Sequence, residues 1–244
     1  MKNIYKSISK RLFRKRHLVS AKSDLKRIAK HCTNSFTAYG ASVAWRGSGY
    51  FESLDLKQSA PEFLGLLRIL ETSAVSSVVE IGSHKGGTLF VWAQLIKSQS
   101  DSFLCSIDLP GGDFGGGLKA GNDSLFEAFC ADGQDLLVLR GDSHSPKTVA
   151  ELDKYLGAEK KVDFLFIDGD HSYQGVKQDF VMYKPFVKSG GFVAFHDIIQ
   201  RDDYPNIEVW KFWDELKLDP ENETQEFVNT DPEHRTIGIG VLRV

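Results

Sequence analysis

Two hydrophobic periods alternate along this chain from about residue 60 onward. Short runs rich in Val, Ile, Leu and Phe predict strands, and the segments between them repeat apolar residues at helical spacing. The predicted strands are Ser76–Ile81, Phe103–Ile107, Leu136–Leu139, Val162–Ile167, Phe192–Phe195 and Thr236–Val244. The predicted helices are Pro61–Leu70, Leu89–Ile96, Asp123–Phe129, Val149–Leu156, Val176–Phe186 and Val209–Leu216. Alternating strands and helices predict an α/β fold with a doubly wound, mostly parallel sheet and helices on both of its faces.

Three segments refine this picture. The run Val162–Ile167 is apolar except for Asp163, as expected of a strand that is buried on both faces of a parallel sheet. Gly190 and Gly191 predict a turn that leads into the following strand. The stretch Thr33–Phe51 is rich in Ser, Gly and aromatic residues, and we expect it to be a loop.

Composition limits the class of protein. The 244 residues are 41% hydrophobic and 26% charged, which suits one soluble domain, and no apolar run has the ~18 residues that a membrane-spanning helix needs. Three cysteines at uneven spacing predict neither a disulfide framework nor a zinc cluster, so we expect a reducing, cytoplasmic location.

Charge divides the chain into two parts. Residues 1–30 carry eleven Lys and Arg against one acidic residue, whereas the other 214 residues hold 19 basic and 32 acidic ones. Apolar residues recur at roughly helical spacing within the basic part, so we predict a basic amphipathic helical leader over residues 1–35 and a catalytic domain over 36–244. The leader either packs on the domain and is solvated, or contacts an anionic membrane surface. Nucleic acid is disfavoured as a partner because the domain is acidic.

The carboxyl ends of the predicted strands carry small and acidic residues, and ligands of such sheets bind at that edge. After the first strand, Gly82 and Gly86 allow close backbone approach, and the next helix offers free N–H groups to an anion. The spacing is G-x-x-x-G-G rather than the dinucleotide fingerprint G-x-G-x-x-G, and a purely structural turn remains an alternative. Asp108 and the Gly141–His144 turn follow the second and third strands, where acids bind ribose hydroxyls or cap helices. We therefore predict that Glu80, Asp108 and Asp142 bind a nucleoside.

The next two strand ends hold the strongest signal. Asp168, Asp170 and His171 follow one strand, and His196 and Asp197 follow the other, 28 residues after Asp168. A site rich in carboxylate oxygens suits a hard divalent cation such as Mg²⁺ or Mn²⁺, which could lower the pKa of a substrate hydroxyl. Helix capping is the alternative role for these side chains.

At these residues the chain, from about residue 60 to 244, resembles class I S-adenosylmethionine (SAM)-dependent methyltransferases. It is most similar to the metal-dependent O-methyltransferases that act on sugars of macrolide and aminocoumarin natural products. The resemblance implies a Rossmann-like, seven-stranded sheet with an antiparallel closing strand. It also implies that the Glu80–Gly87 motif contacts the methionine part of SAM, Asp108 the ribose, and the turn at Asp142 the adenine. The implied cofactor-binding residues are Glu80, Gly82, Ser83, Gly86, Asp108, Asp142, Ser143 and Asp168.

The resemblance further implies a metal site and a general base. Asp168, His196 and Asp197 match the ligands of Mg²⁺ or another divalent cation, although the family usually has an acid where this chain has His196. Asp170 is the implied base, and His171 is a competing one. The glycine-rich segment 111–117 is expected to be a mobile loop over the substrate.

Several functions stay open at this point. One alternative is a nucleotide-dependent oxidoreductase, which the absence of G-x-G-x-x-G disfavours. Two further alternatives are a non-catalytic cofactor-binding scaffold and an iron oxygenase. The expected acceptor is a hydroxyl of a sugar or glycosylated small molecule, with phenolic and lipid-linked acceptors open. We expect the Trp45–Phe51 region, the glycine-rich segment and the stretch 201–208 to shape its pocket, and the chain to form homo-oligomers.

Overall fold

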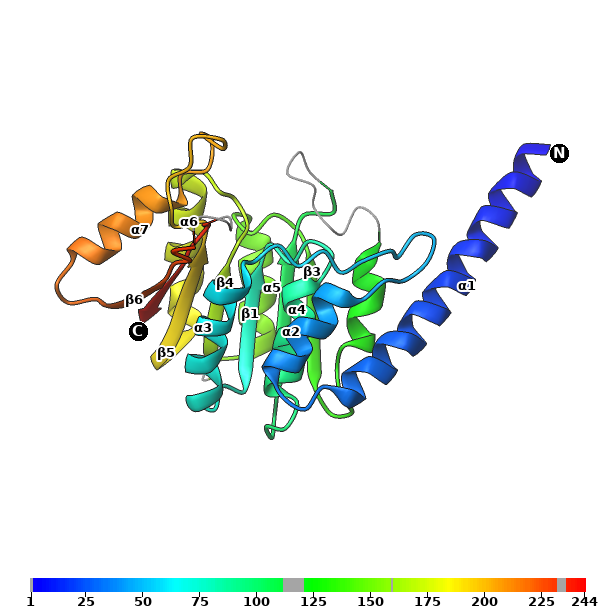
Figure 1. Ribbon diagram of the computed structural model, residues 1–244, viewed down its shortest axis with the longest axis horizontal. Helices are drawn as coiled ribbons and strands as arrows, with labels where there is room; N and C mark the ends of the chain where they lie inside the picture. The colour runs from blue at the N-terminus through cyan, green and yellow to red at the C-terminus, as the bar shows by residue number, and fades with distance from the viewer. Residues whose placement is uncertain (1, 112–120, 159, 232–235) are drawn as a thin grey trace.

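A single mixed sheet with the strand order β3-β2-β1-β4-β5-β7-β6 forms the centre of the molecule, as the computed structural model shows (Figure 1). The structure describes residues 2–111, 121–158, 160–231 and 236–244, with side chains from residue 11 onward. The strands are β1 (Ser77–Ile81), β2 (Phe103–Asp108), β3 (Asp135–Arg140), β4 (Val162–Ile167), β5 (Val187–His196), β6 (Glu223–Phe227) and β7 (Ile239–Arg243). Strands β1 to β5 are mutually parallel, and β7 runs antiparallel to both β5 and β6. This confirms the predicted fold class, including the antiparallel closing strand.

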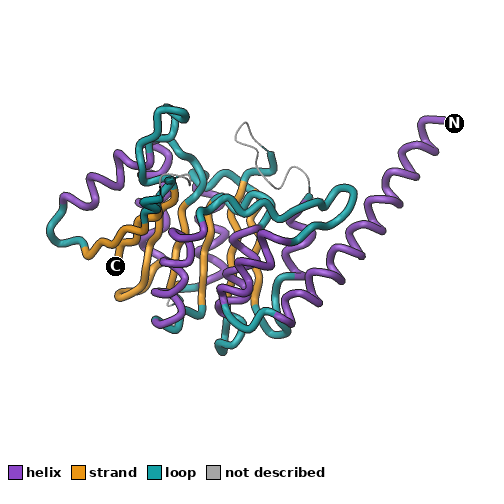
Figure 2. The backbone as a smooth tube through the Cα atoms, in the orientation of Figure 1, coloured by secondary structure: helices purple, strands orange, loops and turns teal. Residues whose placement is uncertain are grey.

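Helices cover both faces of the sheet (Figure 2). The α-helices are α1 (Lys2–His31), α2 (Ser35–Ala44), α3 (Ala60–Thr72), α4 (Gly87–Ile96), α5 (Pro146–Leu156), α6 (Tyr173–Tyr183) and α7 (Val209–Leu218), and two 3₁₀ helices are η2 (Asn122–Ala128) and η3 (Lys184–Phe186). Side chains of successive strand residues point to opposite faces, so Val78 packs in the core beneath α2, α3 and α4, and Val79 in the core beneath α5, α6 and α7. The two cores fix the sheet from both sides.

Strand β4 shows why an apolar run predicts a central strand. All six of its residues are buried, and it lies between β1 and β5. Phe164 and Phe166 face α4, where the ring of Trp92 lies 5.2 and 5.5 Å from their centroids. The one polar member, Asp163, sits at the start of the strand and accepts hydrogen bonds from the backbone N–H groups of Ser76 and Ser77. This packing places the end of β4 at a rigid position.

Helix α1 spans most of the predicted leader, and the leader and its boundary at residue 35 stay a prediction. Its carboxyl-terminal half packs on the body through Ala21 and Leu25, and its other end extends away from the sheet (Figure 1). Lys22 pairs with Glu127 of η2 at 2.8 Å. Among the described residues, no helix is both long and apolar enough to cross a bilayer.

The predicted loop over Thr33–Phe51 is wrong, because α2 occupies its first half. Asn34 caps this helix by accepting a hydrogen bond from the backbone N–H of Thr37 at 2.8 Å, and the Thr37 hydroxyl accepts one from the backbone N–H of Asn34. Small residues on the helix allow close packing on α4, where the Ser42 hydroxyl donates to the carbonyl of Gly87. The signal was the Asn-x-x-Thr spacing, which the local abundance of Ser and Gly obscured.

Other elements also differ from the prediction in their bounds or type. Gly190 and Gly191 lie inside β5, at a register shift against β4, rather than in a turn before it. The predicted helix Asp123–Phe129 is the 3₁₀ helix η2, and the helix predicted to reach Phe186 ends at Tyr183, before η3. Strand β6 was not predicted. Three of the five residues in its sequence ETQEF are polar Glu or Gln, as in many edge strands, so the sequence shows no apolar run.

Candidate active site

The turn after β1 contains two glycines that the surrounding backbone requires. Gly82 has φ +89°, and a Cβ atom there would overlap the backbone carbonyl of Asp168. Gly86 has φ +87° and precedes α4, with its α-carbon against the ring of Phe126. Both positions exclude other residues for structural reasons alone. The close contact between Gly82 and Asp168 also joins the ends of β1 and β4 into one rigid edge.

Glu80 and Ser83 lie beneath this turn. Glu80 is fully buried, and its Oε1 accepts a hydrogen bond from the Trp92 indole N–H at 2.9 Å, while Oε2 has no partner among the described residues. Burial raises the pKa of Glu80 to about 7, although hydrogen bonds from Thr88 and Trp92 oppose the shift. The Ser83 hydroxyl accepts from Ser106 at 2.8 Å. The structure thus places both residues as supports of the turn.

Asp108 connects the ends of β1 and β2. Its Oδ2 accepts a hydrogen bond from the backbone N–H of His84 at 2.6 Å, and its Oδ1 accepts one from Leu109 at 2.7 Å. His84 adopts φ +48°, which turns its N–H toward the carboxylate. Each carboxylate oxygen has a second lone pair, so Asp108 can also accept from ribose hydroxyls.

The end of β3 meets helix α6 through a histidine. Asp142 is exposed and caps the turn by accepting from the backbone N–H of His144 at 2.9 Å, and the Ser143 carbonyl accepts from the Tyr183 hydroxyl at 2.8 Å. Nε2 of His144 lies 3.2 Å from the fully buried carboxylate of Asp179 and 3.1 Å from the Gly175 carbonyl. This contact fixes the turn that carries Asp142 and Ser143 against α6.

The contact between His144 and Asp179 makes the free energy of unfolding depend on pH. The hydrogen bond to Asp179 raises the pKa of His144 from 6.5 to about 9, against a smaller opposing effect of burial. A histidine whose pKa is higher in the folded than in the unfolded chain stabilises the fold. This contribution is complete at a pH below the unfolded-state pKa, and it is lost as the pH rises through the folded-state pKa. We expect the stability difference between the wild type and His144→Asn, measured by urea unfolding, to shrink by about 2 kcal/mol between pH 6.5 and 9.

Gln178→Asn is the matched control, because Gln178 is exposed on α6 and carries no titratable group. Its stability difference from the wild type should stay constant over the same pH range. A constant difference for His144→Asn as well would contradict the role of the His144–Asp179 pair.

Four side chains converge where β4 and β5 end. Asp168, His171, His196 and Asp197 each offer one atom, and these atoms all lie within 4.8 Å of one another. Nδ1 of His196 lies 3.0 Å from Asp168 Oδ1 and 3.2 Å from Asp197 Oδ2. Nε2 of His171 lies 3.3 and 3.2 Å from the same two oxygens. The structure therefore brings the three predicted metal ligands together and adds His171 to them.

Charge couples these four groups. Burial alone would lower the pKa of both histidines, yet the facing carboxylates raise the pKa of His171 and of His196 to about 10. Burial likewise opposes ionisation of Asp168 and Asp197, but the two imidazoles hold the pKa of each carboxyl below its ordinary value. Nε2 of His196 is buried and has no hydrogen-bond partner among the described residues.

Asp170 lies outside this cluster. It is exposed, and its Oδ1 accepts a hydrogen bond from the backbone N–H of Ser172 at the start of α6. Its side chain lies against the α-carbon of Gly175. Asp170 thus supports the turn before α6, whose cap is Ser172, and its role as a base stays a prediction.

Two residues that sequence reasoning missed hold the carboxylates of the cluster. The Gln58 side chain donates from Nε2 to Asp168 Oδ2 at 2.7 Å, and Gln58 is 6% exposed. Arg201 donates from Nη2 to Asp197 Oδ1 at 2.6 Å, and its guanidinium lies over the ring of Tyr204. Asp197 itself has φ +64°, which turns its carboxylate back toward β4.

The segment before α3 crosses the ends of β1 and β4. Asp55 contacts Lys57, His84 and Lys85, at 2.7, 3.1 and 2.9 Å. Burial opposes ionisation of Asp55, but hydrogen bonds from Lys57, Lys85 and His84 hold its pKa below the ordinary value. Asp55 thereby holds this segment, with Gln58, on the turn after β1.

Of the three segments expected to shape an acceptor pocket, one borders the cluster. The stretch 201–208 does so through Arg201. Trp45 is instead buried and donates from its indole to Asp24 of α1 at 2.8 Å, so it supports the leader. The glycine-rich segment 111–117 lies outside the described residues except for Gly111.

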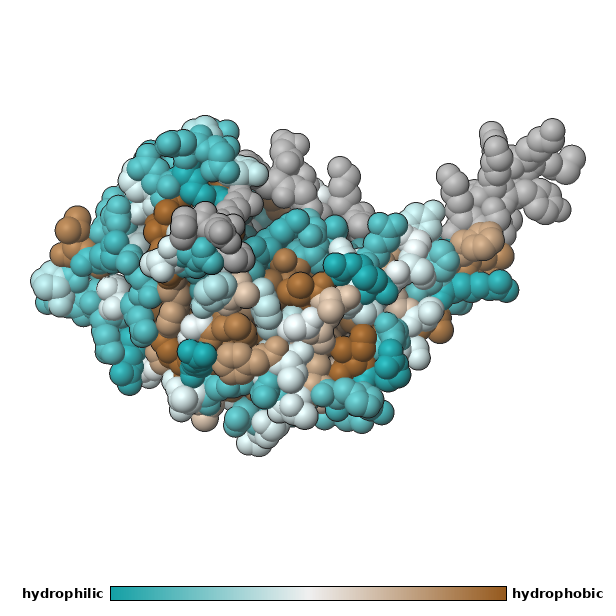
Figure 3. Space-filling view, in the orientation of Figure 1, coloured by the Kyte–Doolittle hydropathy of each residue, from teal (hydrophilic) through white to brown (hydrophobic). Residues whose placement is uncertain are grey.

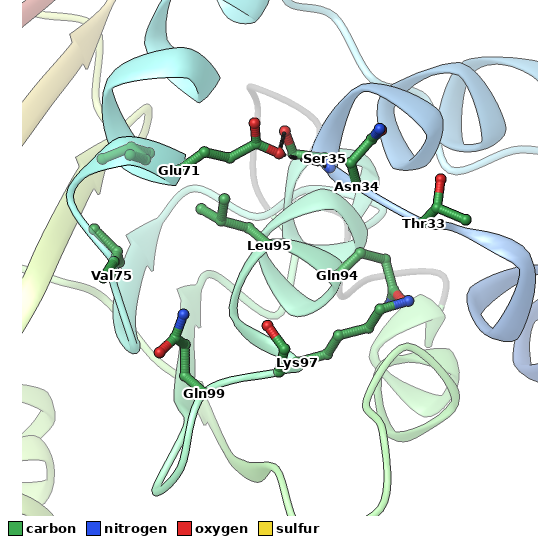
Figure 4. Close-up of a pocket in the computed structure, with 12 residues that line it drawn as sticks. Thr33, Asn34, Ser35, Glu71, Val75, Gln94, Leu95, Lys97 and Gln99 are labelled. Carbon is green, nitrogen blue, oxygen red and sulfur yellow. Dashed lines mark hydrogen bonds between the residues drawn. The ribbon is translucent and has the colours of Figure 1, made fainter.

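A cavity of about 240 Å³ lies at the other edge of the sheet, where the chain enters β1 (Figure 4). Its polar groups bond to one another across helices: Ser35 donates from its hydroxyl to Glu71 at 2.6 Å, and Lys97 donates to the Ala29 carbonyl at 3.1 Å. None of the predicted site residues lines it. The candidate active site is therefore the edge formed by the strand ends, not this cavity.

Comparisons with known proteins match the part of the chain that contains these strand ends. Residues 79–198, which run from β1 past the Asp168–Asp197 cluster, match the family model described as "Methyltransferase domain". The chain is 30% identical over 141 residues to the uncharacterized protein y4gI of Sinorhizobium fredii (strain NBRC 101917 / NGR234). That segment is 57% of this chain but only 15% of y4gI, so the chain spans a small part of this relative.

Solved structures share the fold at low sequence identity. An O-methyltransferase from Bacillus cereus, solved in complex with S-adenosylhomocysteine (SAH), aligns over 92% of this chain and 91% of its own, with a TM-score of 0.55 and 13% identity. The O-methyltransferase TomG from Streptomyces achromogenes, solved with SAM, aligns over 86% and 96%, with a TM-score of 0.54 and 17% identity. Residues 79–198 thus resemble the methyltransferase domain family, and the chain shares the fold of these solved O-methyltransferases.

Proposed function

We propose that this chain is a SAM-dependent O-methyltransferase that uses a divalent cation. The observation that carries the proposal is the edge of strand ends. It brings Asp108 after β2 and the four-residue cluster after β4 and β5, which are 60 to 89 positions apart in sequence, to the same edge of the sheet. The family match over residues 79–198 and the solved neighbours in complex with SAM or SAH support it.

The residues at β1 and β2 fit SAM. The turn from Gly82 to Gly86 brings free N–H groups of α4 to the place where a methionine carboxylate would bind. Asp108 offers acceptor lone pairs to the ribose hydroxyls, and the turn at Asp142 and Ser143 lies where the adenine would be. SAM, when bound, supplies an electrophilic methyl group on a sulfonium.

The four-residue cluster fits a divalent cation. Adjacent ligands at about 2.1 Å from an octahedral cation lie about 3 Å apart, which matches the spacing of the His196 and Asp168 atoms. Two carboxylates with imidazole suit Mn²⁺ or Mg²⁺ among the common ions. Asp168, His196 and Asp197 would hold the ion, which supplies, when bound, a lowered pKa and a fixed position for an acceptor hydroxyl.

We favour neutral His171 over Asp170 as the general base; a cation held by the two carboxylates would offset the negative charge that raises the pKa of this imidazole. Its Nε2 lies beside both carboxylates of the cluster, where a hydroxyl held there would lose its proton. The Asp170 carboxylate instead accepts from the backbone N–H of Ser172, the cap residue of α6. Gln58 and Arg201 keep Asp168 and Asp197 oriented, so His171 accepts the proton from a positioned group.

The proposed acceptor is a hydroxyl of a sugar or glycosylated small molecule. This choice rests on the similarity of the Asp168–His171 and His196–Asp197 motifs to those of sugar O-methyltransferases. Arg201 and Tyr204 border the cluster and would contact the acceptor.

Asp108→Asn should weaken SAM binding about 10- to 100-fold, because a charged acceptor for ribose hydroxyls contributes roughly 1.5–3 kcal/mol. Equilibrium dialysis with radiolabelled SAM measures the effect. Asp101→Asn is the matched control, since Asp101 precedes β2 at the opposite edge of the sheet, and it should bind SAM as the wild type does. Equal affinity of both variants would contradict nucleoside binding at the end of β2.

A further inference from the structure

Helix α1 presents one face to the body and the opposite face to solvent. Ala21 and Leu25 are buried against the body, and Leu18 and Ile28 pack on the same core at helical spacing. Arg14 and His17 continue this face, lying over and beside the ring of Tyr50. The body therefore fixes the rotation of α1 and so determines which residues face outward.

The outward face combines exposed apolar and cationic side chains. Leu12 is 58% exposed and Val19 62% exposed, with Phe13 beside them at 58%. Lys15 and Arg16 lie between them and form no ion pair or hydrogen bond within the described part of the chain. Figure 3 shows brown side chains on the α1 arm next to teal ones, where the arm leaves the body. Large apolar side chains exposed this way on a projecting helix indicate a contact surface.

Charge identifies the chemistry of the partner. Residues 1–30 hold eleven Lys and Arg, and their single acid, Asp24, is bound by Arg27 and the Trp45 indole. The acid is thus not available to neutralise the outward face. An anionic surface is the complementary partner, and each Lys or Arg near such a surface raises the affinity roughly fivefold.

We propose that the outward face of α1 binds an anionic phospholipid surface. The arm extends from the body, so it can lie along a flat surface without a complementary shape (Figure 1). Leu12, Phe13 and Val19 insert among the acyl chains, while Lys15 and Arg16 contact lipid headgroups. A second copy of α1 is disfavoured on this face, because pairing would bring the same cations together. This docking is separate from methyl transfer and does not depend on it.

Vesicle sedimentation with the full chain tests the proposal. The probes are vesicles of phosphatidylcholine alone and of phosphatidylcholine with about one third phosphatidylserine. We expect binding only to the latter, weakened as salt rises from about 0.1 to about 0.5 M. Lys15→Ala/Arg16→Ala should lower the partition coefficient roughly 25-fold, and Leu12→Ser/Val19→Ser roughly 10-fold.

Lys147→Ala/Lys154→Ala is the matched control, because it removes two cations from α5 on the body and should leave the partition coefficient unchanged. Light scattering of the same samples measures the mass of the chain in solution. The proposal is overturned by equal binding to both vesicle types, by no binding to either, or by an equal loss in the α5 control. A concentration-dependent dimer that Lys15→Ala/Arg16→Ala dissociates would overturn it too, since the face would then bind a second copy.

Discussion

Asp168→Asn should lower the rate of methyl transfer about a thousandfold while leaving the affinity for SAH within about threefold of the wild type. The change keeps the size of the side chain and an oxygen for the Gln58 amide, but it removes the negative charge that faces His171 and His196. The affinity of the variant for a divalent cation should fall as well. Titration with Mn²⁺, followed by electron paramagnetic resonance, measures this affinity.

Asp153→Asn is the control for loss of a carboxylate, since Asp153 lies on the exposed side of α5, away from the strand ends. It should keep wild-type rates, SAH affinity and Mn²⁺ affinity. Transfer by Asp168→Asn at the wild-type rate, with a chelator present, would contradict the role of the cation cluster.

Gly82→Ala should lower the free energy of unfolding by about 3 kcal/mol or more. Two effects add at this position: φ is +89°, and the new methyl group would overlap the Asp168 carbonyl. Because that overlap pushes the ends of β1 and β4 apart, any folded fraction should also bind SAH weakly. Urea unfolding measures the first effect, and equilibrium dialysis the second.

Gly133→Ala separates the two effects. Gly133 has the same φ of +89°, but a Cβ atom there would meet nothing within 4 Å. We expect this variant to lose only about 1 kcal/mol, the cost of the left-handed backbone. Equal losses in the two variants would show that the Gly82–Asp168 contact contributes nothing to stability.

The fold was largely predictable, because burial on both faces leaves a simple pattern. The run Val162–Ile167 became β4 with both boundaries as predicted. Elements at the periphery were not predictable in the same way. Helix α2 depends on packing of small residues against α4, and β6 is an edge strand whose pairing with β7 determines its conformation. Neither gives a strong periodic signal.

The candidate site was predictable only where it follows strands. The acids and histidines after β4 and β5 converge because parallel strands end at the same edge. The contacts of Gln58 and Arg201 with the cluster were missed, because both residues come from loops. Gln58 lies 110 positions before Asp168, the residue that it contacts. The contact of Asp170 with the turn before α6 was also hidden, because the sequence does not show which way a side chain points at the start of a helix.

Calorimetric titration of the full chain with SAM, and then with SAH, tests the central claim most directly. The titrations are made with Mg²⁺ and again with a chelator, so that cofactor binding and cation binding are observed separately. The proposed site predicts micromolar binding of both compounds at one site per chain. Absence of heat from both compounds under both metal conditions would contradict the assignment of the strand-end edge as a SAM site.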